Sequence, residues 1–330
     1  MRYLIVCTFA LAACAAEPEP GPELGSQAQA STAITITPSV ASGGSDTATP
    51  QSAHYTYTGG SGAGSGWLVV FLHGVGGTPS GYQTYMEHAN ALGFHVIGLS
   101  YWDTGDYGTP RIENICNIGT LTQTQQSACW GDVRHNMWDG TAVPNFSFPT
   151  HPTVKARLDD VLDYLDATYT GWSQFRESGH PKWSKIVIAG HSMGAGVAAW
   201  IATQKPVHRL VMMSQPQDYV DDGSGGTIPA AWISAGFSSL TPDAMFGLSH
   251  VNDTVSDYGR TMTNWSTFGM SGLYCITSGC INTVCSPLLG QYCGARRLRA
   301  TNGLIDPHND IAQNEAFFGA AWTYMLTRNL

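Results

Sequence analysis

Apolar runs alternate with stretches of helical periodicity from about residue 53 to the C-terminus. Trp67–Leu72 is continuously apolar, which is typical of a parallel strand that is buried on both faces. Further strands are expected at 54–58, 94–99, 185–189, 210–213, 244–248 and 297–300. Helices are expected at 79–91, 154–169, 194–204 and 309–327. This alternation predicts an α/β fold with a mostly parallel sheet and helices on both faces.

The composition supports a folded chain and narrows its class. Of 330 residues, 43% are hydrophobic and only 12% are charged, which excludes a largely disordered protein. Residues 51–330 fit one domain with disulfide-containing insertions. Because 15 Lys and Arg stand against 24 Asp and Glu, the formal net charge is −9. We therefore expect no nucleic-acid partner.

The N-terminus has the pattern of an export signal. Arg2 precedes an apolar run, residues 3–13, that is too short to span a bilayer. Leu11-Ala12-Ala13-Cys14 is similar to a bacterial lipobox, in which Cys14 would carry the lipid; cleavage at Ala13-Cys14-Ala15 with plain secretion is the alternative. We expect a signal peptide at 1–16 and a flexible, Pro-rich linker at 17–50. The mature protein would be secreted or a cell-envelope lipoprotein, contacting membrane only through this anchor.

The remaining cysteines agree with export. They are Cys116, Cys129, Cys275, Cys280, Cys285 and Cys293. An even number in an exported chain predicts disulfides. Cys116 with Cys129 is the expected first pair; the last four allow three connectivities, of which Cys275–Cys293 with Cys280–Cys285 is preferred. Their spacing matches no common zinc pattern, so no metal site is expected, and no cofactor motif is present.

One motif carries candidate chemistry. Gly190-His191-Ser192-Met193-Gly194 is the only G-x-S-x-G sequence in the chain. It follows a predicted buried strand and opens a helix of small residues. Such a sharp turn needs glycines and lifts a serine hydroxyl above the sheet, next to the helix N-terminus.

Four motifs in order resemble the α/β-hydrolase superfamily, from about Trp67 to the C-terminus. Leu72–Gly77 is similar to the oxyanion loop, and the turn at Ser192 to the nucleophile elbow. His250–Val255 is similar to the acid turn, and Pro307-His308 lies where the family has its histidine. The resemblance implies an α/β-hydrolase fold and an esterase- or lipase-like serine hydrolase, although the cysteine-rich segment between acid and histidine departs from the family pattern.

The chemistry of acyl transfer assigns the roles. Ser192 would be the nucleophile, His308 the base that accepts its proton, and Asp253 the carboxylate that orients the ring, with Asp257 and Asp243 as alternative acids. The resemblance implies that the backbone N–H groups of Met193 and Val75 stabilise the oxyanion.

The substrate is less clearly indicated. Tyr101 and Trp102 end a central strand at the edge where ligands bind in open α/β sheets, and Trp232 lies in a Gly/Ser/Pro-rich segment, so these three are candidate substrate-binding residues. The insertions at 103–150 and 217–243 are expected to wall or cover the site. Their low charge favours an uncharged or apolar acyl group on a small or polymeric carboxylic ester. A peptidase or amidase with the same triad, and an inactive surface binding protein, are the alternatives.

Overall fold

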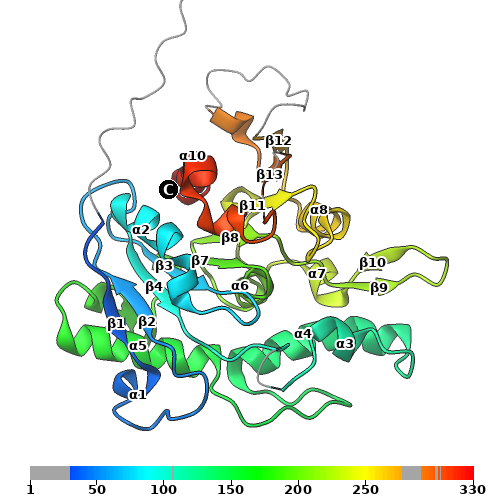
Figure 1. Ribbon diagram of the computed structural model, residues 1–330, viewed down its shortest axis with the longest axis horizontal. Coiled ribbons are helices and arrows are strands. Elements are labelled where there is room, and N and C mark those ends of the chain that lie inside the picture. Colours follow the sequence, from blue (N-terminus) through cyan, green and yellow to red (C-terminus); the bar gives the residue numbers. More distant parts are fainter. Residues whose placement is uncertain (1–29, 106–107, 277–290, 302–303, 305) are drawn as a thin grey trace, which may run out of the picture.

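A nine-stranded sheet forms the centre of the molecule (Figure 1). The computed structural model describes residues 30–105, 108–276, 291–301, 304 and 306–330. The strand order is β1-β2-β4-β3-β7-β8-β11-β13-β12. The first three strands in this order pair antiparallel, and from β4 onward every pairing is parallel. The sheet strands are β1 (Ile34–Ile36), β2 (His54–Tyr57), β3 (Leu68–Leu72), β4 (His95–Leu99), β7 (Ile186–His191), β8 (Arg209–Met213), β11 (Met245–His250), β12 (Leu273–Cys275) and β13 (Arg297–Ala300).

Helices cover both faces of this sheet (Figure 1). They are α1 (Pro38–Ala41), α2 (Gln83–Ala91), α3 (Ile112–Cys116), α4 (Gln123–Asp139), α5 (Val154–Thr168), α6 (Met193–Gln204), α7 (Ala231–Ala235), α8 (Tyr258–Thr267), α9 (Asp310–Gln313) and α10 (Glu315–Thr327). In the central strand β3, Val70 packs into the core shared with α4, α5 and α6, while its neighbour Phe71 packs into the core shared with α2 and α10. Successive side chains of a strand point to opposite faces, so a strand buried on both faces is apolar throughout, as the sequence predicted.

The N-terminal boundary of the domain differs from the prediction. Within the linker predicted at 17–50, residues 34–36 form β1, which pairs with β2 at the edge of the sheet. Asp46 also accepts hydrogen bonds from the buried guanidinium of Arg157 on α5, at 2.8 and 3.4 Å. Strand pairing and this ion pair attach the segment to the domain, so the predicted linker is too long at its C-terminal end.

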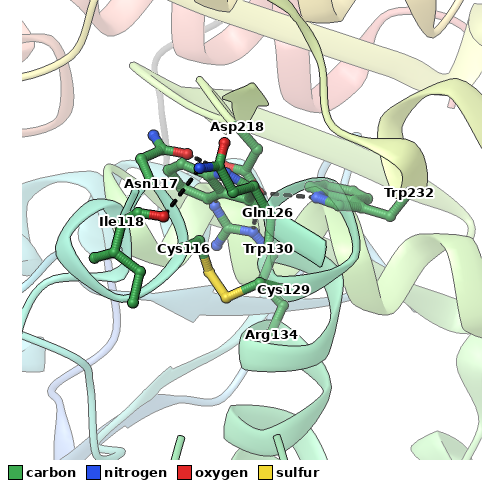
Figure 2. Close-up of a disulfide and its surroundings, with 9 residues drawn as sticks. All are labelled: Cys116, Asn117, Ile118, Gln126, Cys129, Trp130, Arg134, Asp218 and Trp232. Carbon is green, nitrogen blue, oxygen red and sulfur yellow. Dashed lines mark hydrogen bonds and ion pairs between the residues drawn. A yellow bond between two sulfur atoms is a disulfide. The ribbon is translucent and has the colours of Figure 1, made fainter. Parts of the chain in front are cut away.

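The insertion at 103–150 contains more regular structure than its polar sequence suggested. Helix α4 begins with a capping box, in which Thr122 and Gln125 satisfy each other's backbone N–H groups. The predicted Cys116–Cys129 disulfide is present and joins α3 to α4 (Figure 2). The described part of this insertion therefore includes two cross-linked helices, of which α4 packs beside α6.

Further differences lie in the second half of the chain. The terminal helix is divided at Asn314 into α9 and α10. The strands β9 (Tyr219–Asp221) and β10 (Thr227–Pro229) form a hairpin within the 217–243 insertion, and β5 (Arg176–Glu177) pairs with β6 (His180–Pro181). Among the described residues, no helix is both long and apolar enough to cross a membrane.

Candidate active site

Ser192 lies in a strained turn between β7 and α6. Its backbone has φ 54° and ψ −128°, a conformation that non-glycine residues rarely adopt. A Cβ atom on Gly190 would lie 2.4 Å from the Gly194 carbonyl carbon, and one on Gly194 would lie 2.2 Å from the Leu72 oxygen. Both glycines are thus needed to bring strand and helix this close, which is the geometry of a nucleophile elbow.

Asp253 and His308 form a direct hydrogen-bonded pair, although 55 residues separate them in the chain. Asp253 follows β11 and His308 precedes α9, and the ring Nδ1 lies 3.0 and 2.8 Å from the two carboxylate oxygens. An ionised carboxylate only accepts, so Nδ1 carries the proton and the lone pair is on Nε2. This is the tautomer that a general base needs.

The Asp253 carboxylate has several further donors. Its Oδ1 accepts from the N–H groups of Val255 at 2.9 Å and Ser256 at 2.8 Å, and its Oδ2 accepts from the Ser214 hydroxyl at 2.7 Å. Burial opposes ionisation of this carboxyl, but the hydrogen bond and charge of His308, together with the bonds from Ser256 and Ser214, hold its pKa below the ordinary value.

The two alternative acids serve other purposes. Asp257 caps the N-terminus of α8 by accepting from the Arg260 N–H at 2.9 Å. Asp243 is 82% exposed and pairs with Arg296. Asp253 is therefore the candidate acid that is hydrogen-bonded to His308, and Asp257 and Asp243 have other partners.

Ser192 and His308 line one cavity of about 200 Å³. Met193 and Val75, the predicted oxyanion donors, line the same cavity. Met193 is the first residue of α6, so its N–H has no acceptor within the helix. The predicted nucleophile, the predicted base and both predicted oxyanion donors thus line one cavity.

A chain of hydrogen bonds connects the oxyanion loop to the histidine loop. The His308 carbonyl can only accept, so the His191 Nε2–H donates to it at 2.7 Å. His191 Nδ1 must then accept from the Tyr82 hydroxyl at 2.9 Å, and the Tyr82 oxygen accepts from the Gly74 N–H at 3.1 Å. Burial, reinforced by the charge of the neighbouring His308, lowers the pKa of His191 to about 3, which keeps this ring neutral.

Asp103 supports the oxyanion loop from a second side. Its buried carboxylate accepts from the Gly76 N–H at 3.3 Å, directly after Val75. Sequence reasoning missed both Tyr82 and Asp103, because their roles depend on contacts across the fold.

The three aromatic residues predicted to bind substrate do not line this cavity. Tyr101 is completely buried and donates its hydroxyl to the His73 carbonyl at 2.5 Å. Trp102 is buried and stacks on His151 at 3.9 Å between ring centroids. Trp232 donates its Nε1–H to Asp218 at 2.9 Å. The rings of Tyr101 and Trp102 are thus buried in the core directly after β4, and Trp232, on α7, is engaged by Asp218.

The insertion supplies other cavity residues that the sequence analysis did not single out. Arg111, Glu113 and Arg134 come from the α3–α4 region, and Gln215 and Gln217 from the segment after β8. They make the wall more polar than expected. The low overall charge of the insertions did not predict a polar wall, because their few charged residues are concentrated at the cavity.

The other cysteines are partly described. Cys275 and Cys293 both form disulfides. Cys280 and Cys285 lie outside the described residues, as does Cys14, so the predicted connectivity and lipid attachment are not addressed by the structure. In the parts of the chain that the structure describes, no group of three or more His, Cys, Asp or Glu side chains is arranged to hold a metal ion.

The fold is that of an α/β hydrolase, and the match to a protein-family model agrees. The alpha/beta hydrolase family matches residues 69–277, and the chain belongs to this family. Comparison with curated protein sequences yields no match.

Similar solved structures include a Thermus thermophilus protein, with 12% identity, a TM-score of 0.41, and coverage of 88% of this chain and 98% of that chain. Another is a member of the a/b serine hydrolases without lid from Xanthomonas campestris, also with 12% identity and a TM-score of 0.41, covering 91% of this chain and 95% of that chain.

Proposed function

We propose that this protein is an exported serine hydrolase that cleaves carboxylic esters through an acyl-enzyme. The observation that carries the proposal is the shared cavity, which is lined both by Ser192 on its strained turn and by His308 of the His308–Asp253 pair, beside the N-terminus of α6. A serine hydroxyl is a weak nucleophile, and this combination of base, orienting carboxylate and backbone donors is what activates it.

In the proposed reaction, Ser192 Oγ attacks the ester carbonyl carbon while its proton moves to His308 Nε2. The carbonyl oxygen becomes an oxyanion and accepts from the Met193 and Val75 N–H groups; losing one such donor typically raises the barrier by about 3 kcal/mol. The imidazolium, stabilised by Asp253, then protonates the departing alcohol oxygen as the C–O bond breaks. Water repeats the sequence on the acyl-enzyme, releasing the acid and restoring the serine.

Labelling with a fluorophosphonate probe tests the nucleophile. The wild-type protein should be labelled, Ser192→Ala should not, and Ser224→Ala, which changes an exposed serine of the β9–β10 turn, should be labelled like the wild type. Absence of labelling in the wild type would refute the enzyme and favour a surface binding protein.

Hydrolysis of p-nitrophenyl esters and of the matching p-nitroanilides tests the bond type. We expect turnover of the esters at rates far above those of the anilides. Faster turnover of the anilides, after correction for their intrinsic reactivity, would instead indicate an amidase or peptidase.

Export is proposed from the leader at 1–16, and the Cys116–Cys129 disulfide supports it because such bonds persist in oxidising compartments. Expression of the full chain in a bacterium with radiolabelled palmitate tests lipid attachment. Label should enter the wild type and be lost in Cys14→Ser; unlabelled protein in the culture medium would indicate plain secretion, and protein that stays in the cytoplasm would contradict export.

A further inference from the structure

A buried ion pair forms part of the wall of the candidate active site. Arg134 on α4 donates from Nε to one oxygen of Asp218 at 2.6 Å and from Nη2 to the other at 2.5 Å (Figure 2). The two side chains are 1% and 0% exposed. Arg134 lines the cavity that contains Ser192, and Asp218 accepts a second bond from Trp232.

The fold makes specific room for this guanidinium. A Cβ atom on Gly196, four residues after the nucleophile, would lie 2.3 Å from its central carbon. Its Nη1 donates to the Met193 sulfur at 3.6 Å. Arg134 therefore contacts the residue whose N–H is the proposed oxyanion donor.

Not all donors of Arg134 are used. A guanidinium has five N–H hydrogens. Two bind Asp218 and one faces the Met193 sulfur, a weak acceptor. Each guanidinium nitrogen thus has a partner, and the Trp232 ring centroid lies 5.6 Å from the guanidinium carbon. Within the described part of the chain, the remaining two hydrogens form no further hydrogen bond and are free to bind a ligand. A buried ion pair is itself weak evidence for stability, because well-packed apolar residues often do as well. The two remaining N–H hydrogens of Arg134 and the small stabilisation expected from a buried ion pair both favour a ligand oxygen as a further acceptor.

The surroundings support a polar ligand. Gln217 donates to the Glu113 carboxylate at 3.2 Å, and both line the same cavity. Because Asp218 compensates the charge of Arg134, the pair presents donors without a net charge. Such a wall suits a neutral oxygen acceptor better than an anion or a plain hydrocarbon chain.

We propose that Arg134 determines the acyl specificity of this site by donating a hydrogen bond to an oxygen atom within the acyl group. The preferred substrates are then esters of short acyl groups that carry an ether, hydroxyl or carbonyl oxygen. This inference rests on the proposed esterase function, and it narrows the uncharged or apolar acyl group that the sequence suggested to an uncharged acyl group with an oxygen atom.

The experiment uses p-nitrophenyl pentanoate and two analogues, in which the second or the third methylene after the carbonyl carbon is replaced by an ether oxygen. Each kcat/KM is divided by the rate of alkaline hydrolysis of the same ester, which removes differences in intrinsic reactivity. At one oxygen position, the wild type should prefer the ether by about tenfold, since a hydrogen bond from a charged donor contributes on that scale.

Three variants test the assignment to Arg134. Arg134→Met removes the donors but leaves Asp218 unpaired, so the double variant Arg134→Met/Asp218→Asn removes both charges and keeps an acceptor for Trp232. Arg134→Lys keeps the charge but lacks the planar fork. We expect the ether preference to fall to about one in the first two and to an intermediate value in the third.

Arg157→Met is the matched control. Arg157 is also a buried arginine, paired with Asp46, but does not line the cavity. It should lower the melting temperature, because it leaves Asp46 without this partner, and it should leave the ether preference unchanged.

Several results would overturn the inference. They are equal wild-type rates for ether and alkyl esters, a preference that survives in the Arg134 variants, and equal losses on both ester types, which would reduce Arg134 to a positioning residue for Met193. A preference for oxygen only on the alcohol side would contradict the acyl assignment. If the wild type turned over no ester, the proposed function would fail, and this inference with it.

Discussion

Replacing Asp253 by asparagine gives the sharpest test of the candidate triad. The two N–H groups of Val255 and Ser256 require an acceptor, so the asparagine oxygen must take the place of Oδ1. The amide nitrogen then replaces Oδ2 and donates both to His308 Nδ1 and towards the Ser214 hydroxyl.

The consequence follows from the tautomer. With Nδ1 accepting, the proton of the neutral ring moves to Nε2, which can no longer take the proton of Ser192. An equivalent substitution in a serine protease lowers kcat by about 10⁴ while leaving the geometry intact. We expect a loss of about four orders of magnitude here, or about 5 kcal/mol of barrier. Stability should change by no more than about 2 kcal/mol, because the backbone bonds to the side chain remain.

The assay is single-turnover and steady-state hydrolysis of p-nitrophenyl acetate at neutral pH, with stability measured by denaturant unfolding. Asp257→Asn is the matched control, because it makes the same chemical change at the alternative acid, where asparagine is an equally good helix cap. It should retain wild-type kcat.

A kcat within tenfold of wild type for Asp253→Asn in a folded protein would refute the tautomer argument. A large loss of kcat in Asp257→Asn, with Asp253→Asn still active, would identify Asp257 as the acid of the triad.

Three further outcomes are expected. Tyr82→Phe leaves the Gly74 N–H and His191 Nδ1 without their hydrogen-bond partner. The free energy of unfolding, measured in urea, should fall by about 2 kcal/mol, and kcat for ester hydrolysis should fall as well. Unchanged values of both quantities would contradict the hydrogen-bond chain. Replacing Cys116 and Cys129 by alanine removes a cross-link between residues with a sequence separation of 13. The free energy of unfolding in guanidinium should fall by about 3 kcal/mol relative to the oxidised wild type. A fall of less than about 0.5 kcal/mol would contradict a stabilising role of this disulfide. His191 has its pKa lowered to about 3, so the unfolded chain binds this proton below about 6.5 while the folded protein does not. The contribution of His191 to stability is complete above pH 6.5 and should fall by about 2 kcal/mol on acidification to pH 5. Because His54, His73 and His95 add to the pH dependence in the same direction, the measurement is the difference between unfolding curves of the wild type and His191→Gln across this range.

The main elements of the sheet were predictable because their pattern is local. A run such as Trp67–Leu72 has few alternatives to a buried strand, and the structure has β3 within it. The turn at Ser192 was also predictable from the sequence, because close backbone contacts require glycine at positions 190 and 194. Helix α4 was missed because its first turns are polar and its buried positions begin only near Cys129.

The polar wall of the cavity was not predictable in the same way. Arg134 and Asp218 are 84 residues apart, and nothing in either local sequence indicates the other. Tyr101 and Trp102 were at the correct strand end, but whether a ring faces the core or the cavity depends on how the following chain packs, which periodicity does not report.

The disulfide-linked pair α3 and α4 has a consequence for how this protein can change. The proposed chemical step belongs to the turns that follow β7 and β11 and precede α9, whereas Arg134, which we propose to select the acyl group, belongs to a separately cross-linked insertion. Substitutions within that insertion can alter which molecules are accepted while the hydrolytic step is inherited intact. Variant libraries meant to redirect selectivity therefore belong there.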